Sequence, residues 1–127
     1  MLNLNSKLGV DNYFLFNKLT TEELNSLYSN AYALLYLSKY EGFGIPILEA
    51  QRSGCPVIAS DLSSIPEVGG DGYISVQSLE VTCVSDVLLK IQDENYRDEM
   101  LEKGFKNSQR FSWEATSLQY YALISSL

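Results

Sequence analysis

Short apolar runs alternate along the chain with stretches in which apolar residues recur at helical spacing. The apolar runs at 12–17, 31–37, 56–59 and 73–76 predict buried strands, because parallel strands covered on both faces are apolar throughout. The helical spacing predicts helices at 20–28, 46–53, 79–91 and 94–109, and a last helix from 113 to about 125. Strands that alternate with helices favour an α/β fold, here a Rossmann-like, mostly parallel sheet flanked by helices.

Local signals predict where several of these helices begin and end. Thr20 and Glu23 form a capping box, in which each side chain satisfies a backbone N–H of the other residue. Pro46 suits a first helical turn, and Gly54 suits the left-handed residue that ends a helix. Ser112 is a good N-cap for the last helix.

Two loops, 38–45 and 60–72, each follow the carboxyl end of a predicted strand. Carboxyl ends of parallel strands meet at one edge of the sheet, where ligands of doubly wound folds bind. We therefore expect both loops to share one rim of the molecule and any binding site to lie there.

The amino-acid composition of the chain disfavours several classes of function. The chain has 9 Lys and Arg against 16 Asp and Glu, a net charge of −7, which disfavours nucleic acid as a partner. With two cysteines and no histidine, a zinc site is not expected, and two reduced thiols are favoured over a single disulfide. No signal-like start or membrane-spanning apolar stretch is evident, so a soluble, cytoplasmic protein is expected.

The segment 41–49 carries the candidate chemistry. A glycine-rich turn that leads into a helix presents free backbone N–H groups and the positive end of the helix dipole, which suits phosphate. Glu49 falls in the first turns of the helix, where its carboxylate can reach back and accept hydrogen bonds from paired hydroxyls. Glu41 lies in the loop. Two acids around one phosphate site suit a sugar nucleotide, although surface glutamates beside an ordinary loop would give the same spacing.

The order of residues around this segment resembles the E-x7-E signature of family-4-type, retaining GT-B glycosyltransferases. The similarity extends over residues 9–126 and implies a single partial C-terminal donor-binding domain spanning 1–127. The matching segments beyond 41–49 are Ala50, Gly54-Cys55-Pro56-Val57-Ile58, Ser63-Ser64-Ile65-Pro66-Glu67-Val68 and Phe111-Ser112-Trp113. Serines stand at 63 and 64 where the family usually has glycines.

The resemblance implies a role for each matching site residue. Glu49 would bind the ribose hydroxyls of the donor, and Glu41, as the catalytic-site acid, would face the transferred sugar. Donor oxygens would bind along the loop that contains Gly42, Phe43, Gly44 and Ile45. The donor would be a nucleotide-diphosphate sugar, with no metal or further cofactor.

Three other matching residues are expected to be structural. Ser38 would cap the loop, and Glu67 would cap or stabilise its own loop. Trp113 would pack in the core with Phe111 beside it.

Relative to the family, the chain lacks the N-terminal acceptor domain and the first strand–helix units of the C-terminal domain. A glycan or lipid-linked acceptor would bind through that missing domain, so the isolated chain is expected to lack efficient transferase activity. Exposed sheet edges are expected to drive self-association, pairing with a complementing chain, or repositioning of strand 12–17.

Other functions fit parts of the pattern. A non-catalytic sugar-nucleotide-binding or assembly module would retain the donor pocket alone. A sugar-nucleotide epimerase of similar architecture is disfavoured by the Phe43-Gly44-Ile45-Pro46 stretch between the glutamates. A response-regulator-like domain is disfavoured because no acidic cluster follows the first strand.

Overall fold

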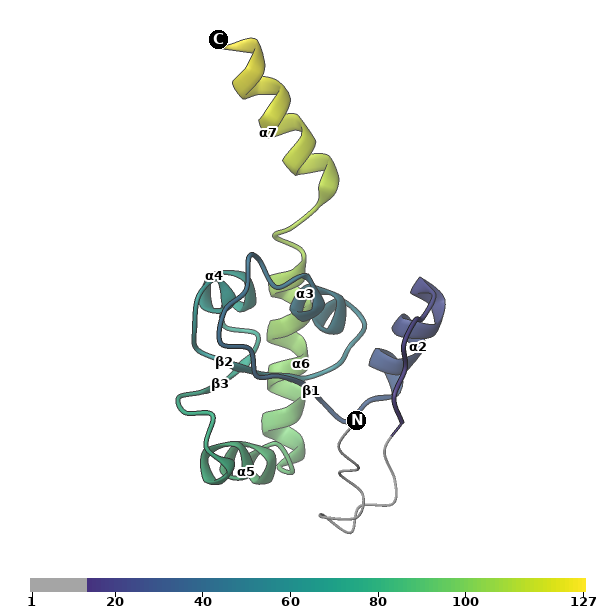
Figure 1. The fold of residues 1–127 in the computed structure, drawn as a ribbon, viewed down its shortest axis with the longest axis vertical. Helices are drawn as coiled ribbons and strands as arrows, with labels where there is room; N and C mark the ends of the chain where they lie inside the picture. The colour runs from purple at the N-terminus through teal and green to yellow at the C-terminus, as the bar shows by residue number, and fades with distance from the viewer. Residues whose placement is uncertain (1–13) are drawn as a thin grey trace.

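The structure, a computed structural model, describes residues 14–127 and shows a parallel sheet with helices on both faces (Figure 1). The strand order is β1-β2-β3, and both neighbouring pairs are parallel. The elements are α2 (Thr21–Asn30), β1 (Leu34–Tyr36), α3 (Ile45–Arg52), β2 (Val57–Ser60), α4 (Ile65–Gly69), β3 (Ile74–Val76), α5 (Val81–Lys90), α6 (Glu94–Ser108) and α7 (Trp113–Ser125). The predicted α/β class is confirmed.

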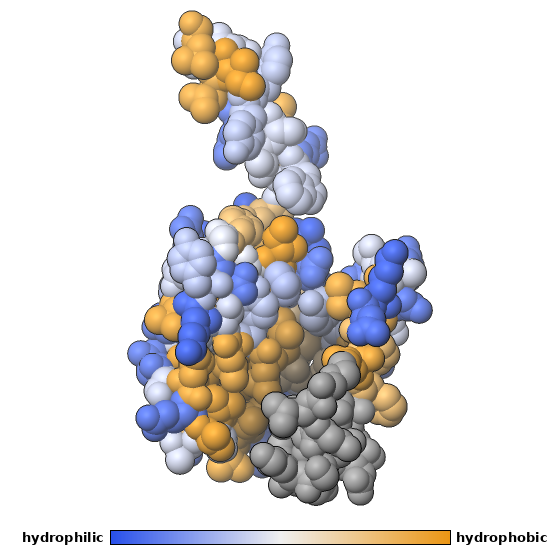
Figure 2. Space-filling view, in the orientation of Figure 1, coloured by the Kyte–Doolittle hydropathy of each residue, from blue (hydrophilic) through white to orange (hydrophobic). Residues whose placement is uncertain are grey.

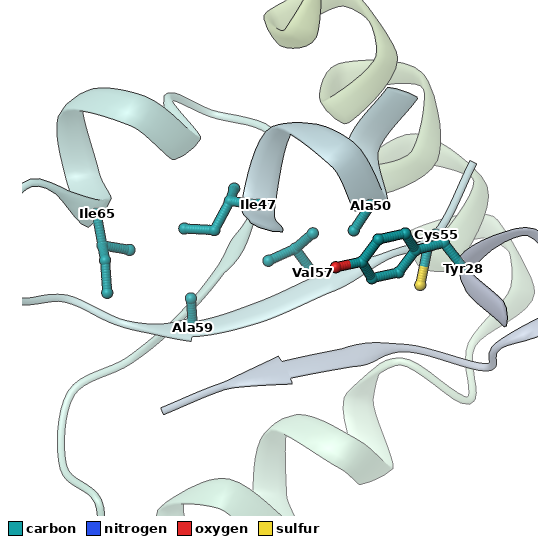
Figure 3. Close-up of a cluster of buried hydrophobic side chains, with 7 residues drawn as sticks. All are labelled: Tyr28, Ile47, Ala50, Cys55, Val57, Ala59 and Ile65. Carbon is teal, nitrogen blue, oxygen red and sulfur yellow. The ribbon is translucent and has the colours of Figure 1, made fainter. Parts of the chain in front are cut away.

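The central strand β2 is buried on both faces, as its apolar sequence predicts. Val57 and Ala59 point toward α3 and α4, into the cluster that contains Tyr28 and Ile47 (Figure 3). Ile58 points to the other face, where a second cluster includes Ile91 and Met100 and packs against α5. Fully burying an apolar side chain of this size contributes about 1.5–3 kcal/mol, so the two clusters hold the helices on both faces of the sheet.

The helix ends predicted from capping residues and from Gly54 are confirmed. The Glu23 N–H donates to the Thr20 hydroxyl over 3.2 Å, and the Thr20 N–H donates to the Glu23 carboxylate over 2.8 Å. Gly54 follows α3 with a φ of 71°, the left-handed region that favours glycine. The Ala115 N–H donates to the Ser112 hydroxyl over 3.0 Å at the start of α7.

The loop 60–72 is more ordered than the sequence predicted, since it contains the short helix α4. Pro66 lies in its first turn, the position that Pro46 occupies in α3. Ile65 and Val68 are buried on its inner side. The prediction of a plain loop was wrong here because four or five residues carry too little periodicity to mark a helix.

The predicted strand 12–17 is not formed in its described part. Asn12 and Tyr13 lie outside the described residues, and residues 14–17 pair with no strand. Phe14 and Leu15 are 83% and 64% exposed. A strand needs a partner for its backbone hydrogen bonds, and among the described residues β1 pairs with β2 alone. Apolar surface appears over the part of the body where β1 and α5 lie (Figure 2).

The prediction that Trp113 packs in the core was also wrong. Helix α7 projects away from the body (Figure 1), and the Trp113 side chain is 82% exposed. Phe111, just before it, is half-buried and packs edge-to-face on Phe43, with 5.8 Å between ring centroids. Apolar periodicity can indicate that a helix has a face to bury, but it does not specify which surface covers that face.

Both cysteines are unpaired, as favoured from the sequence. Cys55 is buried, and burial raises the pKa of its thiol, while Cys83 is half-buried. Across the described part of the chain, no helix has the length and apolar character needed to cross a bilayer.

Candidate functional site

Two serines join the loops that follow β1 and β2. The Ser63 hydroxyl donates to the Glu41 carbonyl over 2.9 Å. The Ser64 hydroxyl lies 3.2 Å from the same carbonyl and 2.9 Å from the Phe43 carbonyl. A hydroxyl has one donor and can satisfy these carbonyls in turn. The predicted shared rim is confirmed.

These contacts also orient the backbone N–H groups of the loop. In a trans peptide the C=O and N–H of one unit point in opposite directions, and the described residues contain no cis peptide bond. Because the Glu41 and Phe43 carbonyls accept from the serine hydroxyls, the N–H groups of Gly42 and Gly44 point away from Ser63 and Ser64. The loop therefore directs two N–H donors away from the serines, an arrangement that suits an anion.

Ser63 stands where the resembled family has a glycine, and its backbone keeps a glycine-like conformation. Its φ is 57°, in the left-handed region, which costs a non-glycine residue roughly 1–2 kcal/mol. The hydrogen bond from its hydroxyl to Glu41 offsets part of this cost. The serine therefore has a less favourable backbone conformation than glycine would have, but its side chain forms a hydrogen bond that fixes the loop.

Helix α3 begins with its first amides open. Gly44 is its N-cap with a φ of 104°, so a side chain at this position would be strained, and no side chain caps the helix there. Pro46 has no N–H to satisfy. The positive end of the α3 dipole and the Ile45 amide thus face the rim beside the amides of Gly42 and Gly44.

A groove of about 780 Å³ runs between α2, α3 and the start of α7. Phe43, Ile45 and Glu49 line it. Of the other predicted site residues, Glu41 does not line this groove, nor do Gly42 and Gly44, which belong to the loop beside it. The structure thus brings three of the six predicted residues into one cavity.

Each acid of the signature has a tyrosine beside it. Burial, followed by the nearby charge of Glu49, raises the pKa of Tyr28 to about 12. Burial, followed by interaction with Glu41, raises the pKa of Tyr36 to about 12. Tyr36 in turn contributes to the raised pKa of Tyr28. Each carboxylate therefore lies near one of two phenols, and these two phenols lie near each other.

Tyr28 should make stability fall at high pH. Its pKa is raised above the value near 10 of an exposed tyrosine, so its contribution to stability is complete below pH 10 and is lost as pH rises through about 12. The free energy of unfolding should fall less steeply between pH 10 and 12 in Tyr28→Phe than in the parent. Denaturant unfolding followed by circular dichroism would measure this, and equal slopes would contradict it. Tyr120→Phe, on exposed α7, is the matched control.

The sequence analysis missed some residues near the site and assigned structural roles to others. Tyr28 and Tyr36 were taken as core and strand residues only, because spacing along the chain does not reveal a contact across the fold. Ser38 caps its loop as predicted, donating to the Tyr40 carbonyl over 3.1 Å. Glu67 is exposed in the first turn of α4, and it makes no side-chain cap there. The serines at 63 and 64 were visible as departures from a glycine pattern, which was the available signal.

Solved structures of other proteins share this architecture. Sucrose-phosphate synthase from Thermosynechococcus elongatus superposes on 97% of this chain with a TM-score of 0.83 at 25% identity, and the match covers 32% of that protein. A GtfA/B complex shares the fold at a TM-score of 0.77 and 18% identity. The fold is thus that of a GT-B-type glycosyltransferase domain.

The sequence comparisons agree. Residues 2–110 match the model of the family "Glycosyl transferases group 1", and the chain belongs to that family. It is 39% identical over 99 residues to O-antigen chain mannosyltransferase B of Escherichia coli. It is 31% identical over 127 residues to D-inositol 3-phosphate glycosyltransferase of Corynebacterium efficiens. The chain spans only 26% and 30% of the lengths of these relatives, and 77% and 97% of its own length is matched.

Proposed function

We propose that this chain is the donor-binding part of a retaining, family-4-type glycosyltransferase that transfers a hexose from a nucleotide-diphosphate sugar. Glu49 binds the ribose hydroxyls, and Glu41 faces the transferred sugar. The amides of Gly42, Gly44 and Ile45 hold donor oxygens, with Phe43 beside them. The donor is the sole small molecule required, without a metal or further cofactor.

The observation that carries this proposal is the position of Glu49 relative to the start of α3. Glu49 lines the same groove as Ile45, whose amide belongs to the open end of the helix. A carboxylate would repel a phosphate bound directly to it, whereas it accepts hydrogen bonds from a hydroxylated group next to that phosphate. A nucleotide-diphosphate sugar provides both groups in one molecule.

The same arrangement supports the bond-breaking step. When the bond between the sugar anomeric carbon and the diphosphate oxygen breaks, negative charge grows on the diphosphate. Preorganised N–H groups and a helix dipole stabilise such charge because they need no reorganisation during the reaction. In this proposal Glu41 holds the hydroxyls of the sugar or stabilises the positive charge that develops at the anomeric carbon.

The relatives suggest which sugar to test first. Several of these relatives are named as mannosyltransferases. One is O-antigen chain mannosyltransferase RfbU of Salmonella typhimurium, which is 46% identical to this chain over 66 residues. We therefore propose a nucleotide-diphosphate mannose as the donor. The acceptor, a glycan or lipid-linked sugar, would bind to a complementing chain or domain or within a self-associated assembly. Free Cys55 and Cys83 fit a reducing, cytoplasmic location.

A second function, the non-catalytic donor-binding module expected as the alternative from the sequence, would use the groove and the open start of α3 for binding alone. One pair of experiments distinguishes the two. Calorimetric titration with a panel of nucleotide-diphosphate hexoses should show saturable binding of at least one donor. Product assays with the same donors and simple sugar acceptors should show little transfer by this chain alone. Robust transfer would show that the chain is not a non-catalytic module. Absence of binding to any donor would overturn both proposed functions.

A further inference from the structure

The loop 38–44, which follows β1, is held in place by serine side chains. Within residues 14–127, no backbone N–H group donates to a carbonyl of residues 38–43. Four of these carbonyls accept from serine hydroxyls, namely those of Ser38, Tyr40, Glu41 and Phe43. Most hydrogen bonds in folded proteins join two backbone groups, so the conformation of this loop depends to an unusual degree on side chains.

The first part of the loop is attached to the core of the sheet. Ser60, the last residue of β2, is 1% exposed, and its hydroxyl donates to the Ser38 carbonyl. The Ser38 hydroxyl donates in turn to the Tyr40 carbonyl. A buried residue of the central strand therefore fixes the place where the loop begins.

The second part of the loop depends on Ser63 and Ser64. Within the described residues, their hydroxyls are the only groups that donate to the Glu41 and Phe43 carbonyls. Glycines, which the resembled family usually has at these two positions, carry no hydroxyl. This chain therefore holds the part of the loop that contains Glu41 with two side chains that a glycine pair would not provide.

The order of this part of the loop affects how tightly an anion can bind to it. Within residues 14–127, the N–H groups of residues 40–45 donate to no backbone carbonyl, so they are available to a ligand. A loop that becomes ordered only on binding lowers the affinity, because the ligand must offset the lost backbone entropy. Ordering one residue weakens binding by about a factor of ten in the dissociation constant.

We propose that Ser63 and Ser64 are positioning residues of the donor site. Their hydroxyls fix the loop before the donor binds, so Glu41 and the amides of Gly42 and Gly44 need little ordering on binding. The serines act through the carbonyls that they hold and do not contact the donor themselves. The inference rests on the proposed function, because it takes this loop as the part that holds the sugar and the diphosphate.

Removing both hydroxyls should weaken donor binding about tenfold, the cost of ordering one residue. The variant combines Ser63→Gly with Ser64→Ala, and calorimetry measures its affinity for the nucleotide-diphosphate hexose that binds the parent most tightly. Glycine adopts the φ of 57° found at position 63 without strain, so the unfolding midpoint should stay close to that of the parent. Ser63→Gly combined with Ser64→Thr keeps one hydroxyl and should recover most of the affinity.

The matched control removes two hydroxyls far from the loop in sequence. Ser117 and Ser126 donate to carbonyls of α7 over 2.8 and 2.7 Å, and neither serine lines the groove. The variant that combines Ser117→Ala with Ser126→Ala should therefore bind the donor as tightly as the parent does.

Amide relaxation measured by NMR without ligand tests the order of the loop directly. The heteronuclear NOE of the Gly42 and Gly44 amides should be high in the parent and in the control, and it should fall in the variant that lacks both hydroxyls. A role in stability alone would lower the unfolding midpoint and leave the loop ordered in the folded molecules.

The outcomes separate this inference from the proposed function. If the variant without both hydroxyls binds the donor as tightly as the control does, the inference is wrong and the proposed donor site stands. If its affinity falls while both glycine amides stay ordered, the serines contact the donor directly, and their role as positioning residues is overturned. If the parent binds no nucleotide-diphosphate hexose, the proposed function and the inference both fail.

Discussion

Replacing Glu49 with glutamine should weaken binding of the nucleotide-diphosphate sugar by tenfold or more. Hydrogen bonds to a charged group contribute about 1.5–3 kcal/mol, and each 1.4 kcal/mol corresponds to a factor of ten in the dissociation constant. The amide of glutamine keeps the size of the side chain but loses the charge and one acceptor. Since ribose is common to donor and product, the same loss should appear with the nucleoside diphosphate alone.

Glu41→Gln should give a different pattern in the same titrations. Glu41 faces the transferred sugar in the proposed site, so its loss should weaken the nucleotide-diphosphate sugar and leave the nucleoside diphosphate unchanged. Glu67→Gln, an exposed acid on α4 at the same rim, is the matched control and should change neither. If Glu49→Gln binds both ligands as tightly as the Glu67 variant does, the role proposed for Glu49 is refuted.

The largest stability effect is expected from Asn107→Ala. The Asn107 side chain is 3% exposed and donates to the Gln51 side-chain oxygen and to the Val68 carbonyl, each over 2.8 Å. Gln51 donates in turn to the carbonyls of Gly69 and Gly72. Alanine leaves two buried acceptors without a donor, and an unsatisfied buried group costs about 1–3 kcal/mol. We expect the free energy of unfolding to fall by about 3 kcal/mol.

Urea unfolding of the parent and the variant measures this change. Asn95→Ala is the matched control, because Asn95 lies on the same helix, α6, and is exposed. Its substitution should change stability by about 0.5 kcal/mol or less. Equal unfolding midpoints for the two variants would show that the buried amides do not join α3, α4 and α6 in the way proposed.

The local geometry of the candidate site could be predicted from the sequence. Gly44 before Pro46 specified where α3 starts, and the spacing to Glu49 placed that acid in its early turns. The sequence did not indicate that Tyr28 from α2 lies near Glu49, or that Tyr36 from β1 lies near Glu41. These tyrosines meet the acids only after distant segments have packed together.

The Gln51–Asn107 contact was equally invisible in the sequence. The two residues lie 56 positions apart, and each would be an ordinary polar position of its helix. Their burial follows from the close packing of α3 on α6. No periodicity of polar residues distinguishes a buried, satisfied amide from a solvated one.

By itself the sequence determined the elements whose cause lies within a few residues: the capping box at Thr20, the end of α3 at Gly54, the cap at Ser112 and the buried parallel strand β2. Only the tertiary structure decided which apolar segments are buried against another part of the fold. The predicted strand 12–17 and Trp113 are as apolar as residues in the core. Residues 14–17 and Trp113 are nevertheless exposed. Local patterns record the tendency of a segment to bury a face, whereas burial itself requires a second surface that other parts of the fold must supply.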